Sequence, residues 1–154
     1  MDGIVLIRDR KEEIGILKSF LTHEFKIKDL RNLKYFLKMK IARSKTGIAI
    51  SQRKYVLNLL KEIGMLGYKP TNTPINYIIK LGTVEGSALM DKGRYQRLVG
   101  KIIHLSYTRP NITFSISVVN QVMNNPIEEH MKVVYRILRY LKMTLGKGLY
   151  FKRT

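Results

Sequence analysis

The spacing of apolar residues differs between the two halves of the chain. In the second half they recur every three or four residues, the pattern of helices with one buried face. The first half holds two such patterns, at 11–24 and at 55–63, among short strand-like runs. We therefore predict an α+β fold, in which a few-stranded antiparallel sheet with a helix precedes a mainly helical region. The predicted helix faces of the second half are Tyr95, Leu98, Val99, Ile102 and Ile103; Ile112, Ile116, Val119 and Met123; and Val134, Ile137, Leu138 and Leu141.

The strand-like runs are short. The apolar run at 3–7 suits a buried strand, and the alternation of apolar residues with lysines at 33–43 predicts one continuous strand with a solvent-facing side. Ser44-Lys45-Thr46-Gly47 predicts a hairpin loop that leads into a returning strand. Further short strands are expected at 75–79 and 148–151.

Capping residues predict where several helices begin and end. Ser51 is expected to be the N-cap of a helix that Gly64 ends. Further helices are expected to start near Asp91 and, with Asn111 as the cap, before Ile112. The last helix is predicted over 127–144, where His130 at the edge of the apolar face favours a packed or capping role over a metal ligand.

An irregular connector is predicted between the two halves. Pro70, Pro74, Gly82 and Gly86 fall within a stretch of fewer than twenty residues, and such residues interrupt helices and strands. The predicted organisation is therefore 1–67, then a connector at 68–90, then a helical region at 91–154.

Positive charge is the most informative part of the composition. Lysine and arginine total 29 against 11 acids, a formal net charge of +18. An excess of this size favours a polyanion such as nucleic acid as a partner, although a merely solvated basic surface gives the same number. No run of about 18 apolar residues predicts a membrane span. The acidic N-terminal stretch does not resemble a secretory signal or a transit peptide.

Cations line one face of two predicted helices. Arg94, Arg97 and Lys101 lie within about 60° on the first helix, and Lys132, Arg136 and Arg139 do the same on the last. Such stripes suit phosphate contacts, which require charge and spacing but no base recognition. Each stripe alone is equally typical of an ordinary solvated helix face.

No set of residues indicates an enzyme site from its chemistry alone. The acids show no spacing typical of a metal pair, and His23, His104 and His130 are far apart in the sequence. No glycine-rich phosphate loop is present, and Ser51 and Ser106 have no base beside them in the sequence. The absence of cysteine excludes disulfides and thiolate metal sites.

Several short motifs resemble those of copia-type retrotransposon reverse transcriptases, in the family's order along almost the whole chain. Asp2-Gly3-Ile4-Val5-Leu6 resembles the end of the family's Tyr-Val-Asp-Asp hairpin and the strand that follows it. The other matching motifs are Lys28–Leu37, Gly47–Tyr55, Gly64-Met65-Leu66 with Lys69-Pro70 and Thr73-Pro74, Tyr95–Gly100, Thr108–Ile112, and Arg136–Lys142 with His130 before it.

The resemblance implies an enzyme that copies RNA into DNA with two Mg²⁺ ions held by three aspartates. Asp2 falls on the first aspartate of the hairpin and Gly3 on the second. The earlier aspartate, the fingers and most of the palm would lie upstream of Met1. At most one metal-binding carboxylate therefore remains, so we expect no bound metal and no polymerisation by this chain alone.

The same resemblance implies what each region does. Residues 1–67 would be the end of the palm with a primer-gripping hairpin and the next helix, and 91–154 a thumb and connection region that stops before ribonuclease H. The expected partners are an RNA–DNA hybrid or DNA, held by its backbone, and the rest of the polyprotein, in the cytoplasm or nucleus and not at a membrane. The expected contacts are Arg94, Arg97, Lys101, Arg109, Lys132, Arg136 and Arg139.

Some positions depart from the family's pattern. Arg31, Lys38 and Met143 stand where the family has glycine. If the backbone there requires a positive φ, each costs on the order of 1–3 kcal/mol. Three hypotheses stay open: a non-catalytic remnant of the polyprotein, a retained nucleic-acid-binding module, and one part of an intact polymerase whose other parts are encoded upstream.

Overall fold

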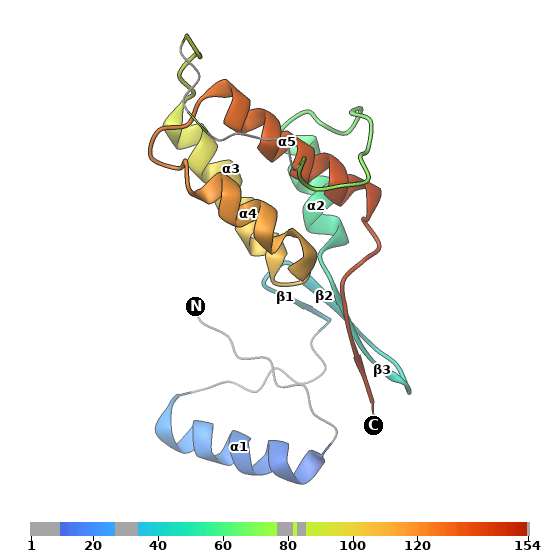
Figure 1. Ribbon diagram of the computed structural model, residues 1–154. Coiled ribbons are helices and arrows are strands. Elements are labelled where there is room, and N and C mark those ends of the chain that lie inside the picture. The colour runs from blue at the N-terminus through green and yellow to red at the C-terminus, as the bar shows by residue number, and fades with distance from the viewer. Residues whose placement is uncertain (1–9, 27–33, 77–81, 83–85, 154) are drawn as a thin grey trace. The chain divides into compact units, whose positions relative to one another are not determined.

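The computed structural model describes residues 10–26, 34–76, 82 and 86–153. The chain forms two compact units, and Figure 1 labels most of their helices and strands. The sheet unit consists of residues 1–50 and 150–154, and the helical unit of residues 51–149. Strands and helices together confirm the α+β prediction. None of the helices in the described ranges has the length and apolar composition that a membrane crossing requires.

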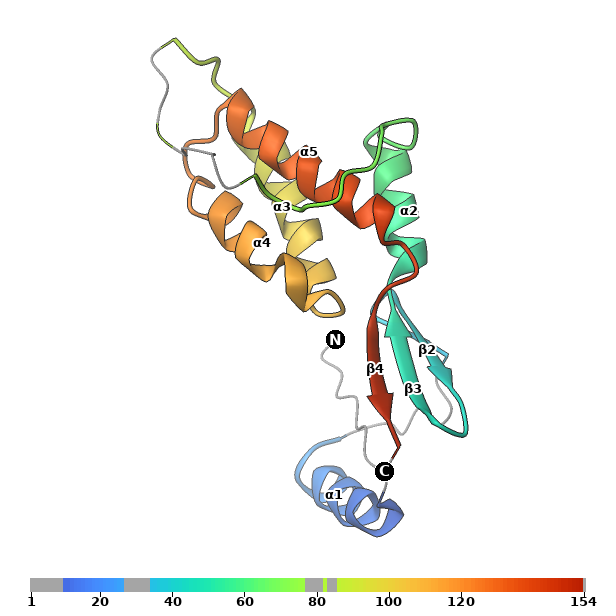
Figure 2. The ribbon, with the colours of Figure 1, turned by 45° about the vertical axis from the view of Figure 1, so that its right-hand side comes forward.

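In its described residues, the sheet unit contains one helix and a four-stranded antiparallel sheet. The helix α1 (Lys11–Glu24) has the predicted bounds. The strands β1 (Tyr35–Phe36), β2 (Met39–Arg43), β3 (Gly47–Ser51) and β4 (Leu149–Lys152) lie in the order β1-β2-β3-β4. Figure 2 shows β4 beside β3. The predicted hairpin loop is confirmed, because the Ser44 backbone N–H donates to the Gly47 carbonyl at 2.9 Å.

The prediction of one continuous strand over 33–43 is wrong. A two-residue turn at Leu37 and Lys38 divides it into β1 and β2, which pair antiparallel with Phe36 opposite Met39. Both turn residues have positive φ, 45° at Leu37 and 64° at Lys38. Such a turn suits the twist of a hairpin, but asparagine and glycine are the residues that adopt it readily. The alternation of apolar residues and lysines hides the turn because neither turn residue is a usual one.

Glycine is required at position 47, next to β4. A Cβ atom on Gly47 would collide with the Phe151 backbone carbonyl and with the Tyr150 ring. The Tyr150 hydroxyl donates to Thr46 Oγ1 at 2.8 Å, and the Arg153 backbone N–H donates to the Thr46 carbonyl at 2.8 Å. These contacts hold the expected C-terminal strand against β3.

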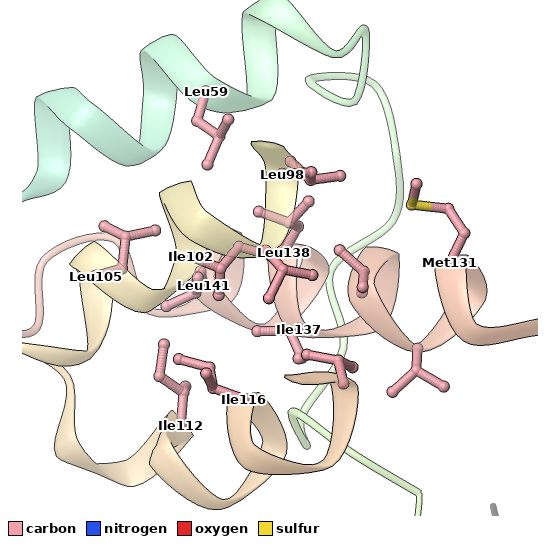
Figure 3. Close-up of a cluster of buried hydrophobic side chains, with 14 of the residues drawn as sticks. Leu59, Leu98, Ile102, Leu105, Ile112, Ile116, Met131, Ile137, Leu138 and Leu141 are labelled. Atoms are coloured by element: carbon pink, nitrogen blue, oxygen red, sulfur yellow. The ribbon is translucent and has the colours of Figure 1, made fainter. Parts of the chain in front are cut away.

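The helical unit packs four helices around one apolar core. They are α2 (Arg53–Glu62), α3 (Lys92–Ser106), α4 (Thr113–Asn120) and α5 (Glu128–Met143), with a short 3₁₀ turn, η1 (Pro110–Ile112), before α4. Figure 3 shows core side chains from each of these helices pointing toward one another. Tyr95 lies at the centre, where its hydroxyl donates to the Val119 carbonyl at 2.8 Å and burial raises the pKa of the phenol.

Local hydrogen bonds end and start these helices. Gly64, with φ 71°, donates its N–H to the Lys61 carbonyl, and Met65 donates to the Leu60 carbonyl. This pair of bonds is the Schellman motif, so the prediction that Gly64 ends the helix is confirmed. At the start of α3, Asp91 Oδ1 accepts the Arg94 backbone N–H at 3.0 Å.

His130 has the predicted capping role. It is buried in the first turn of α5, and its Nδ1 accepts the Ile127 backbone N–H at 3.1 Å. That bond satisfies one of the donors that a helix start otherwise leaves unpaired.

Two of the expected caps are wrong. Ser51 is the last residue of β3, and Gln52 occupies the cap position of α2. Asn111 lies inside η1, and its side-chain amide instead donates to the Tyr140 hydroxyl. In both cases a neighbouring element extends further than the sequence pattern indicates.

The connector has no helix or strand in its described residues, apart from an isolated bridge between Leu89 and Ile127. Ile75 is buried in the core of the helical unit. The strand expected at 3–7 and most of that at 75–79 lie outside the described residues. The boundaries at 67 and 90 stay a prediction about reverse-transcriptase subdomains.

Candidate nucleic-acid interface

The cations of α3 fall into two groups. Arg94 and Arg97 are exposed, and neither side chain has a hydrogen bond or an ion pair within the described ranges. The Arg97 guanidinium lies back over Gly93, as close as 3.3 Å to where a Cβ atom would be. Both guanidiniums stand on a helix whose opposite face is anchored in the core, so their backbone positions are fixed.

Lys101, the third cation of this stripe, already has a carboxylate partner. Its ammonium group pairs with Glu62 of α2. The Tyr55 hydroxyl donates to the Lys101 backbone carbonyl at 3.5 Å, and the Tyr55 ring meets His104 edge-on at 5.3 Å between centroids. Burial, and secondly Glu62, raise the pKa of the Tyr55 phenol. Lys101 therefore joins α3 to α2 and offers less charge to an external anion than its neighbours do.

The cations of α5 lie along one face, as predicted, but most of them donate hydrogen bonds to the segment 66–73, which includes the start of the connector. Arg136 Nη2 donates to Thr73 Oγ1 at 2.8 Å, and Arg139 Nε donates to the Lys69 carbonyl at 2.6 Å. Lys142 Nζ donates to the carbonyls of Leu66 and Tyr68. Figures 1 and 2 both show the segment 66–73, drawn in green, running across α5.

Lys132, at the start of the same face, is different. It is exposed and has no partner within the described part of the chain. Glu128 lies four residues before it on α5.

Arg109 is an internal residue in this structure. It is 4% exposed, and its guanidinium donates to the carbonyl of Thr144 at 2.8 Å and to the Thr144 hydroxyl. The Tyr140 ring lies 6.0 Å from the guanidinium carbon. Burial lowers the pKa of Arg109, while Tyr140 opposes this change. These contacts join the end of α5 to the turn before η1, and they leave Arg109 little surface for a phosphate.

Sequence reasoning missed Lys142 and Thr73 as members of the α5 surface. Lys142 follows Arg139 by three residues and so lies one turn further along nearly the same face, which was a usable signal. Thr73 had no such signal, because its position depends on how the connector folds back onto α5.

The expected remnant of the catalytic hairpin, Asp2 with Gly3, lies outside the described residues. Within the described ranges, no group of three or more histidines and acids could hold a metal ion. Of the three positions where the family has glycine, Lys38 has the positive φ described above, Met143 ends α5 without one, and Arg31 is not described.

Comparison with known proteins gives consistent matches. The model of the family "Reverse transcriptase (RNA-dependent DNA polymerase)" matches residues 1–77. The chain is 38% identical over 133 residues to the retrovirus-related Pol polyprotein from transposon RE1 of Arabidopsis thaliana, covering 86% of this chain and 9% of that protein. It is 35% identical to the Pol polyprotein from transposon TNT 1-94 of Nicotiana tabacum, covering 98% of this chain and 12% of that protein.

A shorter relative matches over nearly the whole chain. An uncharacterised mitochondrial protein of Arabidopsis thaliana is 32% identical over 154 residues, covering 99% of this chain and 63% of the relative. No solved structure matches. The chain thus spans about a tenth of the Pol polyproteins that it resembles, and both the family match and these polyproteins agree with the motifs read from the sequence. The chain belongs to the reverse transcriptase family and is a fragment of a copia-type retrotransposon Pol polyprotein.

Proposed function

We propose that this chain binds a nucleic-acid duplex by its phosphate backbone and does not polymerise DNA by itself. One observation carries the proposal: Arg94 and Arg97 are exposed on one face of α3 and have no carboxylate partner within the described residues. Lys132 on α5 shares these properties. Cations held on a rigid helix can contact phosphates with little further loss of backbone freedom.

The overall charge and the family support a polyanionic partner. The formal net charge of +18 favours association with nucleic acid at low salt. Reverse transcriptases act on RNA and DNA, so the duplex of this proposal is an RNA–DNA hybrid or DNA. Of the seven expected contacts, Arg94, Arg97 and Lys132 are the ones that are exposed and have no partner in the part of the chain that the structure describes.

The proposed lack of polymerisation rests on the catalytic carboxylates. Two Mg²⁺ ions require several carboxylate ligands, and the resemblance assigns only Asp2 to that set, with Gly3 at its neighbour's position. A primer-extension assay with the purified chain, Mg²⁺ and a primed RNA template should give no template-dependent product. Synthesis of such a product would overturn this part of the proposal.

The proposed duplex binding is tested by measuring how its affinity depends on salt concentration. The chain should bind a short RNA–DNA hybrid at about 50 mM salt and lose affinity steeply toward 200 mM. The slope of the logarithm of the binding constant against the logarithm of the salt concentration counts the phosphate contacts, at about 0.9 per contact. Replacing Arg94 and Arg97 together by glutamine should reduce the magnitude of this slope by roughly two. Lys147→Gln, at an exposed lysine in the turn after α5, is the control for loss of charge elsewhere on the surface and should leave the slope nearly unchanged. Equal slopes for the double variant and the parent chain would reject α3 as the contact surface.

A second candidate function is supported by length. Because the chain spans 9% of the RE1 polyprotein, it can serve as one part of a longer polymerase that supplies the other carboxylates. If this second function is correct, a longer chain that includes this segment should extend a primer. The same longer chain should give no extension product when the upstream aspartates are replaced by asparagine.

A further inference from the structure

The connector and α5 together hold a group of cations that pair with no anion among the described residues. Arg136, Arg139 and Lys142 each donate to oxygen atoms of the segment 66–73. All of those acceptors are neutral, being backbone carbonyls and one hydroxyl. No carboxylate pairs with these cations within the described part of the chain, and the acids of α5 itself, Glu128 and Glu129, are confined to its first turn.

The two guanidiniums are fixed in place by these bonds. Arg136 is tied through Nη2 to Thr73, and Arg139 through Nε to the Lys69 carbonyl. The Thr71 backbone N–H also donates to the Arg139 carbonyl at 3.4 Å, which binds the connector to the helix backbone. Arginines that are already ordered lose little entropy when a ligand binds, which favours affinity.

Unused donors remain on this surface. A guanidinium carries five N–H groups, and one of them is used on each arginine. Arg136 Nε is buried and has no partner among the described residues, so this arginine would bind a ligand through its two Nη groups. The Thr73 hydroxyl accepts from Arg136, so its own proton is available to a further acceptor.

We propose that Arg136, Arg139 and Thr73 form a preorganised binding site for one phosphate group. Planar guanidinium forks match the oxygens of phosphate, and a charged ligand removes the imbalance left by neutral acceptors. This site is separate from Arg94 and Arg97 of α3. It rests on the proposed function in that the phosphate is supplied by nucleic acid, either within the backbone or at a 5′ end.

The first measurement uses the unaltered chain. The Nε–H and Nη–H resonances of Arg136 and Arg139 are followed by NMR during titration with inorganic phosphate, and again with chloride at the same ionic strength. Phosphate should shift the Nη resonances of both arginines in a saturable way, while chloride should not. Equal responses to the two salts, or no response, would overturn the site without any question of misfolding.

The second measurement separates this site from α3. Because both guanidiniums bind one phosphate, Arg136→Gln with Arg139→Gln should lower the salt slope for the hybrid by about one, and not two. Thr73→Val, which keeps the side-chain shape, should weaken the inorganic-phosphate response several-fold. Lys147→Gln is again the control at an exposed lysine outside this site.

The outcomes distinguish the two proposals. If the α3 double variant loses slope and the folded α5 variants do not, the phosphate site is wrong and the proposed function stands. If the α5 variants lose slope and the α3 variant does not, the site stands and the assignment to α3 fails. Hybrids with 5′-phosphate and 5′-hydroxyl ends identify the source: an effect of the α5 variants on both hybrids indicates a backbone phosphate, and an effect on the phosphorylated hybrid alone indicates an end.

Discussion

The helical unit contains twenty of the twenty-two buried apolar residues in the described part of the chain, and the sheet unit contains two, Ile41 and Ile50. In the sheet unit α1 buries none of its residues, and Ile16 and Phe20 are 72% and 59% exposed. A sheet and a helix each need a second apolar layer to bury one face. The helices provide that layer for one another, whereas the described residues of the sheet unit do not.

The helical unit therefore contributes most of the stability of the chain's described part. Apolar burial is the main favourable term in folding, so the helical unit should hold its structure when the sheet unit is perturbed. Four predictions, each with its own control variant, test whether the helical unit is the more stable one.

Leu138→Ala should have the largest effect. Leu138 is fully buried among the helices, so its truncation should lower the free energy of unfolding of the helical unit by about 3 kcal/mol. Leu17→Ala on α1, where the side chain is 41% exposed, should change stability by less than about 0.5 kcal/mol. Urea denaturation followed by far-UV circular dichroism measures both. Similar losses for the two variants would contradict the comparison.

Gly47→Ala should loosen the sheet unit alone. The new Cβ atom collides with the Phe151 carbonyl and the Tyr150 ring, so β4 must move away from β3 at a cost of about 1–3 kcal/mol. Hydrogen exchange at the Arg153 amide, which donates to Thr46, should accelerate, while amides of α3 should not change.

Gly100→Ala is the matched control for Gly47→Ala. Gly100 lies inside α3 with nothing within 4 Å of its Cβ position, so alanine should stabilise the helix by roughly 0.5–1 kcal/mol. If both substitutions changed the hydrogen-exchange rates of the same amides, the two units would not be independent in stability.

His130→Ala should destabilise the start of α5. The Ile127 backbone N–H loses its acceptor, which should cost about 1–2 kcal/mol in the unfolding of the helical unit. His130→Gln keeps an acceptor at the third helical position and should recover part of this loss. Thermal unfolding of the three proteins measures the effect, and an equal loss in both variants would argue that packing of the imidazole matters more than the cap.

Helix positions could be predicted well from the sequence, because the apolar residues of α1, α3 and α5 repeat at the helical period. In α3 and α5 these residues form the buried face of the helix. Gly64 and His130 could be predicted as end signals for the same local reason. The caps Ser51 and Asn111 could not, because β3 and η1 extend over them, and this depends on contacts beyond the immediate sequence.

The candidate interface could be predicted only as two faces of positive charge. Helical spacing places Arg94 and Arg136 on such faces, but it does not say which cations are already occupied. Arg136 and Arg139 bind Thr73 and Lys69 of the connector, which lie 63 and 70 residues earlier in the chain. Arg109 is buried because the end of α5 folds over it. Sequence spacing carries no information about contacts of this range.

The smallest effect should come from the turn between β1 and β2. Leu37 and Lys38 both have positive φ, which asparagine and glycine adopt more readily. Leu37→Asn with Lys38→Gly should therefore stabilise the hairpin by about 1 kcal/mol. The Ile41 amide, which donates to the Lys34 carbonyl at 2.8 Å, should exchange more slowly, and α5 amides should not change. Lys40→Gly, within β2, is the control and should speed exchange at the same amide because glycine weakens strands. If the double substitution instead sped exchange at Ile41, the side chains of Leu37 and Lys38 would contribute more to the sheet unit than their backbone strain costs it.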